Sequence, residues 1–279
     1  MNYEITGLYF CFYYNSKFKI VRKKTAYECR FTKQTLIDRH KIQTFYKNIF
    51  MKNQDPNISP IAWKPNWESI DTVLLDMDGT LLDKHFDDYF WEHYVPEIFA
   101  EKNDLTPLEA RKELLARYKS IEGTLAWTDL DYWSEKLGLD IPALKLKINH
   151  LIQVHPYVID FLQYCRSLGK KVHLVTNAHS KTLDIKMKKT DLGGHFDRII
   201  CSEEVGLPKE DPKFWERLES ILGFDKQRTL LADDNDTVLQ AAQTYGMEVL
   251  IFVARPSSRA EIHYSLQFPS IVYFKELIV

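Results

Sequence analysis

Two aspartates, Asp76 and Asp78, follow the most strand-like stretch of the chain, the uncharged β-branched and aliphatic run Thr72 to Leu75. Such a run is typical of a strand buried on both faces of a parallel sheet. Side chains two positions apart in extended chain point the same way, and Gly79 allows a sharp turn just beyond them. Two carboxylates in one small volume repel each other unless a cation or a shared proton intervenes. The spacing therefore predicts a site for a hard divalent cation such as Mg²⁺.

A second acidic group follows the predicted strand Thr229 to Ala232 and reads Asp233, Asp234, Asn235, Asp236. One interpretation is a solvated acidic turn before a helix at 237–245, with Asp236 as the helix cap. The other is a cation site, because adjacent acids at the end of a buried strand are costly without a counter-charge. Open α/β sheets bind ligands at the carboxyl ends of their strands, which is where both acidic groups are expected.

Groups able to bind phosphate stand at two further positions. Thr176 and Asn177 follow the predicted strand Lys171 to Val175, where a hydroxyl and an amide can donate to phosphate oxygens or simply cap the next helix. Lys209 follows the turn Gly206 to Pro208, which presents its ammonium to a phosphate or to solvent. Polar residues at four strand ends together indicate a site better than any one of them.

The order of predicted elements indicates the fold. Residues 83–155 carry helical patterns and no strand-like alternation, and helices and strands alternate from 158 to 253. This order predicts an α/β protein with a doubly wound parallel sheet and an inserted group of four helices. The tail from Ser257 is predicted to form a helix, followed by a short strand or coil around 270–274.

Composition excludes several classes of protein. The chain has 279 residues, 45% of them hydrophobic, with 37 basic and 39 acidic side chains, enough for one α/β domain with an insertion. The four cysteines show no C-x-x-C spacing, which argues against a zinc site or a disulfide framework and favours a cytoplasmic protein. The apolar run Leu8 to Tyr14 is shorter than the ~20 residues that span a bilayer, so we expect no membrane anchor.

Residues 1–57 differ from the rest. Met1 to Lys52 holds 11 basic and 3 acidic residues, so the remainder of the chain is acidic and nucleic acid is an unfavourable partner for it. This N-terminal extension has three interpretations: a functional basic arm, a small structured addition, or a disordered or untranslated segment ahead of a true start near Met51. We favour the third.

The run Asp76-Met-Asp-Gly-Thr-Leu81 resembles the first motif of the haloacid dehalogenase-like (HAD) hydrolases. With the surrounding residues 71–83, 86–91 and 130–140, the chain resembles the bacterial GMP/IMP nucleotidases within that superfamily from about Ile58 to its end. The resemblance implies a HAD-like Rossmannoid core at 58–83 and 156–279, and a helical cap at 84–155 that closes over the substrate.

The resemblance also implies roles for the site residues. Asp76 is the expected nucleophile and Asp78 the expected general acid/base. Mg²⁺ is expected on Asp76, on Asp234, on the main-chain carbonyl of Asp78, and on Asp233 as an alternative ligand. The phosphate is expected to contact five residues: Gly79, Thr80, Thr176, Asn177 and Lys209.

Substrate identity depends on the cap. Five of its aromatic residues can stack on a purine or simply form the interior of the cap: Phe90, Trp91, Trp127, Tyr132 and Trp133. The leading hypothesis is a Mg²⁺-dependent 5′-nucleotidase that hydrolyses GMP and IMP through an aspartyl-phosphate. The alternatives are a HAD phosphatase or phosphomutase for sugar phosphates and a non-catalytic binding module. The expected partner is a small phosphomonoester, with neither nucleic acid nor membrane, and the oligomeric state stays open, a monomer included.

Overall fold

The computed structural model describes residues 17–23, 26–32 and 64–279. In the first two ranges, β1 (Lys17–Lys23) pairs with β2 (Ala26–Thr32) as an antiparallel hairpin. That pairing was not predicted, because no alternating pattern marks the segment. The rest of the N-terminal extension lies outside the described residues, so the preference for a disordered or untranslated segment stays a prediction there.

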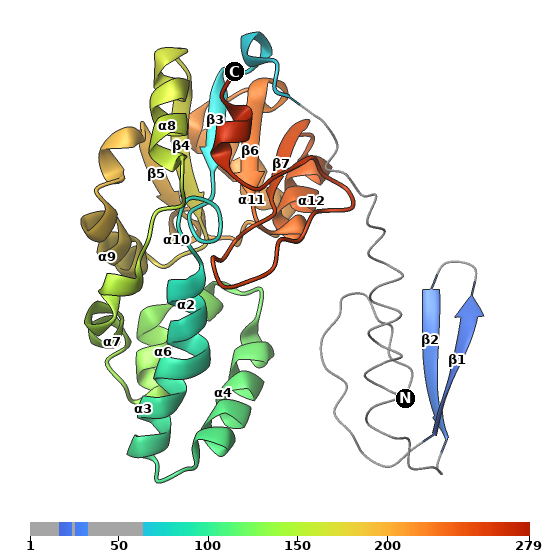
Figure 1. The fold of residues 1–279 in the computed structure, drawn as a ribbon, viewed down its shortest axis with the longest axis vertical. Coiled ribbons are helices and arrows are strands. Elements are labelled where there is room, and N and C mark those ends of the chain that lie inside the picture. The colour runs from blue at the N-terminus through green and yellow to red at the C-terminus, as the bar shows by residue number, and fades with distance from the viewer. Residues whose placement is uncertain (1–16, 24–25, 33–63) are drawn as a thin grey trace. The chain divides into compact units, whose positions relative to one another are not determined.

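The main body, residues 60–279, contains a six-stranded parallel sheet in the order β5-β4-β3-β6-β7-β8 (Figure 1). Its strands run as follows: β3 Thr72–Leu75, β4 Lys171–Thr176, β5 Arg198–Cys201, β6 Thr229–Asp233, β7 Val249–Val253 and β8 Ser270–Ile271. The strands predicted at 72–75, 171–175 and 229–232 are confirmed to within one residue at each end, whereas the strand or coil predicted around 270–274 is a strand only over the two residues of β8. The predicted parallel sheet is confirmed as well.

Helices cover both faces of the sheet, as the apolar strands require. They are α8 (Val158–Ser167), α9 (Ser180–Thr190), α10 (Ser202–Val205), α11 (Pro212–Leu222) and α12 (Asp236–Tyr245). Val73 and Leu75 of β3 join one apolar core with α8, whereas Leu74 joins a second core with α11 and α12. Alternate side chains of one fully buried strand thus serve two cores, which is the doubly wound arrangement.

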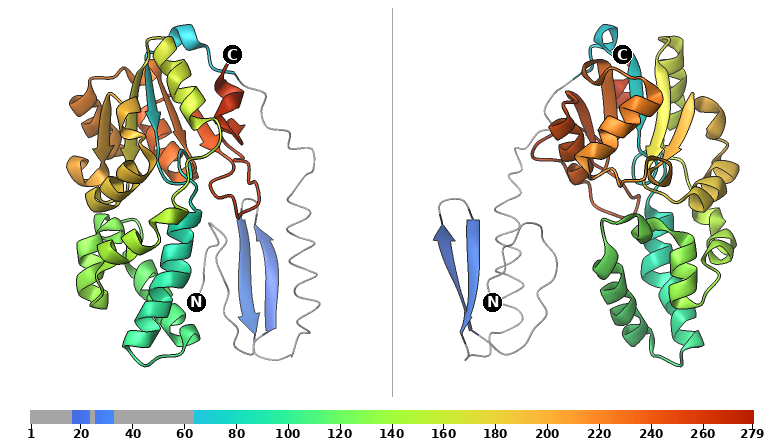
Figure 2. Two further views of the ribbon diagram at one scale, coloured as in Figure 1. Left: turned by 60° about the vertical axis from the view of Figure 1, so that its left-hand side comes forward. Right: turned by 180° about the vertical axis from the view of Figure 1, so that it is seen from behind.

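A helical insertion, residues 84–155, lies beyond the carboxyl ends of the strands (Figures 1 and 2). It comprises α2 (His85–Tyr89), the π-helical turn Phe90–Tyr94, α3 (Val95–Lys102), α4 (Pro107–Ile121), α5 (Leu125–Thr128), α6 (Leu130–Leu137), α7 (Ile141–Lys147) and the 3₁₀ turn Asn149–Leu151. These are six α-helices where four were predicted, and one of the extra breaks, between α5 and α6, falls at Asp129. This side chain accepts the N–H groups of Asp131 and Tyr132 and so starts a new helix.

Two predictions for the C-terminal part are wrong. Residues 257–269 form no helix, because Ser265 and Ser270 bond to nearby backbone groups and offer the chain an alternative to helical bonds. The cap of α12 is Asn235, which accepts the N–H of Thr237, and not Asp236. The chain ends in a 3₁₀ turn, Phe274–Leu277, against α8.

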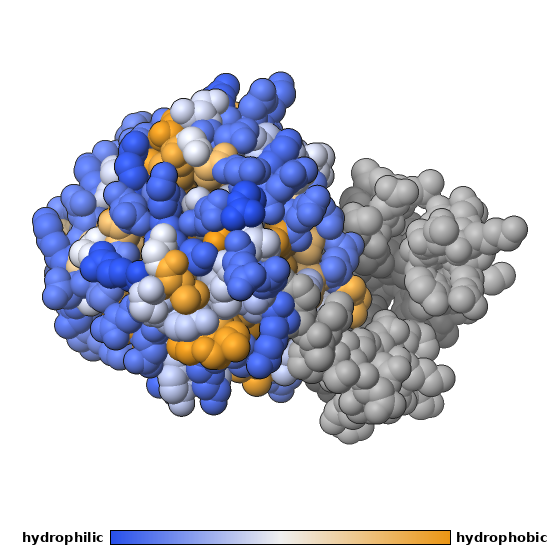
Figure 3. Space-filling model, turned by 90° about the horizontal axis from the view of Figure 1, so that it is seen from above, coloured by the Kyte–Doolittle hydropathy of each residue, from blue (hydrophilic) through white to orange (hydrophobic). Residues whose placement is uncertain are grey.

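The face of the main body seen in Figure 3 is mostly hydrophilic, with apolar patches between the hydrophilic residues. Among the described residues, no helix combines the length and the apolar composition needed to span a bilayer.

Candidate active site

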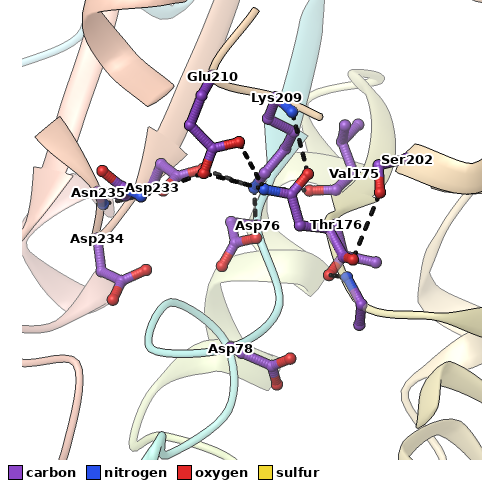
Figure 4. A network of polar contacts seen from close by, with 12 residues as sticks. Asp76, Asp78, Val175, Thr176, Ser202, Lys209, Glu210, Asp233, Asp234 and Asn235 are labelled. Carbon is purple, nitrogen blue, oxygen red and sulfur yellow. Dashed lines mark hydrogen bonds and ion pairs between the residues drawn. The ribbon is translucent and has the colours of Figure 1, made fainter. Parts of the chain in front are cut away.

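A buried lysine joins the ends of two strands. Lys209 Nζ lies 2.5 Å from Oδ1 of Asp76 and 2.7 Å from Oδ2 of Asp233, and it donates to the carbonyl of Val175 at 3.2 Å (Figure 4). All three charged residues are buried. The structure thus brings Asp76, Lys209 and Asp233 of the second acidic group together at the carboxyl edge of the sheet, where the sequence predicted them.

The sheet register explains why these carboxylates meet. Leu75 of β3 lies opposite Ala232 of β6, so Asp76 and Asp233 are the next residues on adjacent parallel strands. The N–H of Asp76 donates to the carbonyl of Ala232 at 3.1 Å. Both acids therefore leave the sheet at the same height, which a spacing of more than 150 residues does not reveal.

Asn177 positions the loop that carries Lys209. Its Oδ1 accepts the N–H of Lys209 at 3.0 Å, and its Nδ2 donates to the carboxylate of Glu210 at 2.9 Å. The indole N–H of Trp215 donates to the carbonyl of Lys209 at 3.0 Å. Asn177 was predicted to bind phosphate, but its amide is engaged in holding Lys209 in place.

Three carboxylates are arranged to share a cation. One oxygen from each of Asp76, Asp233 and Asp234 lies within 4.8 Å of the others. Asp233 is already bonded through both oxygens, to the N–H of Asn235 and to Lys209, whereas the carboxylate of Asp234 is bonded, within the described part of the chain, to Lys84 alone at 3.4 Å. Asp76 and Asp234 thus retain oxygen atoms for a hard divalent ion, and these residues fit Mg²⁺.

Burial without a cation shifts the protonation of these acids. Removal from water raises the pKa of Asp76 to about 6 despite the nearby Lys209 ammonium, and the Asp233 carboxylate adds to this rise. Burial likewise raises the pKa values of Asp233 and Asp234 to about 6. The cluster is thus held in an unfavourable electrostatic state that a bound cation would relieve.

Gly79 brings the loop after β3 close to Asp234. Its φ of +89° is rarely adopted by residues with a side chain, and an added Cβ would lie 2.4 Å from Oδ2 of Asp234. Its N–H donates to the carbonyl of Leu82 at 2.8 Å, so phosphate binding through this amide requires that bond to open. The direct geometric consequence of Gly79 is the space for the Asp234 carboxylate.

Two threonine hydroxyls complete the predicted phosphate contacts. Thr176 Oγ1 accepts the N–H of Ala178 at 3.0 Å, which leaves its proton available to a ligand. Thr80 Oγ1 is fully buried and has no hydrogen-bond partner among the described residues. A buried hydroxyl in that state is unfavourable, and an incoming anion would satisfy it.

Asp78 is set apart from the Asp76 and Lys209 group (Figure 4). The strand ends at Leu75, so the alternation that predicted Asp76 and Asp78 on one face no longer applies at Asp78. Its Oδ1 lies 2.5 Å from Nζ of Lys186. Burial raises the pKa of Asp78 to about 6, opposed by Lys186 and supported by the charges of Asp87 and Asp76.

The aromatic residues of the insertion pack mainly against one another. Phe90 and Trp133 are 0% and 2% exposed, so neither offers a face to a purine. Trp91, Trp127 and Tyr132 are partly exposed, but each makes a ring contact with Trp133. Phe90 and Trp133 therefore form the interior of the insertion, which was the alternative to stacking on a purine.

The sequence analysis did not identify three charged residues beside the site: Lys84, Asp87 and Lys186. Lys84 lies near Asp234, and Lys186 contacts both Asp78 and Asp87. A single lysine on a polar helix is ordinarily solvated, so nothing singled out Lys186. In the structure Lys186 falls four residues after Thr182 on the same face of α9, and both residues are buried.

Comparisons with known proteins show the family of the chain. Residues 70–246 match the family described as haloacid dehalogenase-like hydrolase. The chain belongs to this family. It is 40% identical to the GMP/IMP nucleotidase YrfG of Escherichia coli (strain K12) over 213 residues, which cover 76% of this chain and 96% of that protein. It is therefore a HAD-type phosphatase.

Two solved structures support the fold. The HAD phosphatase from Thermococcus onnurineus superposes with a TM-score of 0.62 at 24% identity, covering 75% of this chain and 96% of that one. A putative β-phosphoglucomutase from Thermotoga maritima gives a TM-score of 0.55 at 18% identity, over 75% and 97% of the two chains. At these identities the likeness concerns the fold of this HAD protein alone.

Proposed function

We propose that this HAD phosphatase is a Mg²⁺-dependent 5′-nucleotidase that hydrolyses purine monophosphates, GMP and IMP above all. The observation that carries the proposal is the buried contact between Asp76 and Lys209 within a cluster of three carboxylates. The 40% identity to a GMP/IMP nucleotidase over almost the whole of that protein supports the substrate class.

The cation would be held by the carboxylates of Asp76 and Asp234 and by the main-chain carbonyl of Asp78, with Asp233 behind them. When bound, Mg²⁺ supplies charge neutralisation for the substrate phosphate. Lys209 adds a fixed positive charge at the nucleophile, and the hydroxyls of Thr80 and Thr176 donate to the remaining phosphate oxygens.

Hydrolysis takes place in two displacements. An oxygen of Asp76 attacks phosphorus while the bond to the 5′-oxygen breaks, and Asp78 gives its proton to that oxygen as the nucleoside leaves. Asp78, now a carboxylate, takes a proton from water, which attacks the aspartyl-phosphate and releases inorganic phosphate. The pKa of Asp78, raised by burial to about 6, suits a group that first gives and then takes a proton.

The helical insertion, residues 84–155, acts as the cap. It lies beyond the carboxyl ends of the strands and is tied to the core by Lys84, which contacts Asp234, and by Asp87, which contacts Lys186. Closure over bound nucleotide would exclude water from the first displacement. The catalytic core then comprises residues 58–83 and 156–279.

The test is phosphate release with Mg²⁺ across GMP, IMP, AMP, pyrimidine monophosphates and several sugar phosphates. GMP and IMP should give the highest kcat/KM. Asp76→Asn should abolish turnover, and Asp71→Asn serves as the matched control. Asp71 lies just before the amino end of the same strand and pairs with Arg228 at the surface, so its variant should keep full activity. Preference for sugar phosphates would overturn the nucleotidase proposal, and full activity of Asp76→Asn would overturn the nucleophile.

A further inference from the structure

A buried chain of alternating charges runs from the helical insertion to Asp78. Lys186 Nζ lies 2.5 Å from both Oδ1 of Asp78 and Oδ2 of Asp87, and Lys145 Nζ lies 2.8 Å from Oδ1 of Asp87. Each lysine is only 1% exposed. Lys145 and Asp87 come from α7 and α2 of the insertion, Lys186 comes from α9, and Asp78 lies in the loop after β3. The ion pairs therefore join three separate parts of the fold.

The contacts around Lys186 fix the position of its ammonium group. It is bonded to two carboxylates and lies 5.4 Å from the ring centre of Phe86, while Lys145 lies 4.6 Å from that of Phe90. Although burial alone would raise the pKa of Asp87, the two ammonium groups hold it well below its ordinary value. Asp87 is thus an ionised anchor from the insertion for the lysine of the core.

A buried ion-pair chain is rarely the most stable way to fill such a space. Apolar residues of similar volume often give equal or greater stability, because they avoid the cost of removing charges from water. The arrangement does, however, fix direction, since each ammonium must face its carboxylates. Among the described residues, Lys186 is the one ion-pair partner of Asp78.

We propose that Lys186 is a positioning residue for proton transfer by Asp78, and that Asp87 connects Lys186 to the helical insertion. Lys186 touches no reacting atom; it sets where the Asp78 carboxyl group lies relative to the leaving oxygen. The proposal rests on the function proposed above, in which Asp78 gives its proton as the phosphorus–oxygen bond breaks and the oxygen keeps the bonding electron pair.

Leaving groups separate this role from a merely structural one. The alkoxide of a nucleoside or sugar is a poor leaving group and needs a proton as it departs, whereas p-nitrophenolate leaves without one. Misplacement of Asp78 should therefore slow the first displacement for alkyl esters and spare it for p-nitrophenyl phosphate. General loss of structure would slow both.

The experiment is single-turnover kinetics of wild type and variants with two substrates. One is p-nitrophenyl phosphate, and the other is the alkyl phosphomonoester that wild type hydrolyses fastest. Lys186→Met should slow the first displacement about 10²-fold for the alkyl ester and less than about 3-fold for p-nitrophenyl phosphate. Lys186→Arg, which keeps the charge, should recover part of the loss.

A double variant protects the test against misfolding. Lys186→Met with Asp87→Asn removes one charge of each sign, so the interior keeps its balance, and it should show the same leaving-group dependence. Lys226→Met is the matched control, because this half-buried lysine also lies over a ring, that of Tyr245, but just before the amino end of β6. It should match wild type with both substrates.

The outcomes distinguish this inference from the function it rests on. Equal slowing of both substrates, or no slowing of either, in a folded Lys186→Met protein would overturn the positioning role and leave the phosphatase intact. If wild type prefers a sugar phosphate, the nucleotidase proposal fails, but the leaving-group comparison proceeds with that ester. Absence of phosphatase activity in wild type would overturn both.

Discussion

The ammonium of Lys209 lies 2.5 Å from Oδ1 of Asp76, just after β3, one of the two central strands of the sheet. The same ammonium contacts Asp233, so one cation holds the proposed nucleophile and a neighbouring acid together. Those carboxylates in turn raise the pKa of Lys209 above its ordinary value, although burial alone would lower it. The two carboxylates therefore favour the charged form of Lys209, and we expect this residue to serve both the fold and the proposed phosphate site.

Lys209→Met should lower kcat/KM for GMP by about 10³-fold, because a fixed charge that stabilises the transferred phosphoryl group is lost. It should also lower the free energy of unfolding by about 3–5 kcal/mol, since two buried carboxylates lose their shared partner. Phosphate release and denaturant unfolding measure the two effects. Lys213→Met, an exposed change in the first turn of α11, is the control and should alter neither. Wild-type turnover by Lys209→Met would contradict the role.

Asp234→Asn should stabilise the cation-free protein while abolishing Mg²⁺ binding. The folded pKa of about 6 exceeds the ordinary 3.8, so the fold favours the protonated group. The protonated Asp234 side chain stabilises the folded state fully below pH 3.8, and this stabilisation is lost as the pH rises through about 6. A neutral amide avoids that cost, and at pH 7.5 the free energy of unfolding should rise by about 1–3 kcal/mol. Denaturant unfolding with EDTA tests this; the gain should shrink at pH 5.

Mg²⁺ affinity should fall between pH 7.5 and pH 5.5. Protons compete with the cation for the carboxylates of Asp76 and Asp234, whose pKa values burial raises to about 6. Below that pH each displaced proton weakens binding by about tenfold per pH unit. Calorimetric titration with MgCl₂ should therefore show a dissociation constant at least about tenfold higher at pH 5.5. A constant affinity over this range would mean that ordinary, exposed carboxylates bind the ion.

Gly79→Ala should weaken Mg²⁺ binding through Asp234, because the new Cβ would occupy the place of that carboxylate. Gly123→Ala is a matched control: its φ of +78° is similar, but an added Cβ there meets nothing within 4 Å. Both variants should lose about 1 kcal/mol from the unfavourable backbone conformation. Only Gly79→Ala should raise the dissociation constant for Mg²⁺, by about tenfold or more. Equal Mg²⁺ affinity in the two variants would show that Asp234 does not bind the ion.

Local pattern determined the strands and their polar ends. Uninterrupted apolar runs such as Thr72 to Leu75 are recognisable because both faces of a parallel strand are buried. Asp76, Asp234 and Lys209 were found for the same reason, since each stands where a predicted strand or turn ends. The helical character of residues 84–155 was also predicted, although the break at Asp129 depends on one side chain that accepts a backbone N–H three residues further on.

Only the tertiary structure decided which charges meet. The register of β3 against β6 brings Asp76 beside Asp233, and the packing of α9 against the insertion brings Lys186 to Asp78 and Asp87. Such contacts join residues about 100 or more positions apart, and a charged side chain has the same sequence signature whether it is solvated or buried. The sequence by itself therefore determined the fold class and the position of the proposed nucleophile, while three-dimensional packing decided how Asp78 is directed and that Asn177 supports Lys209.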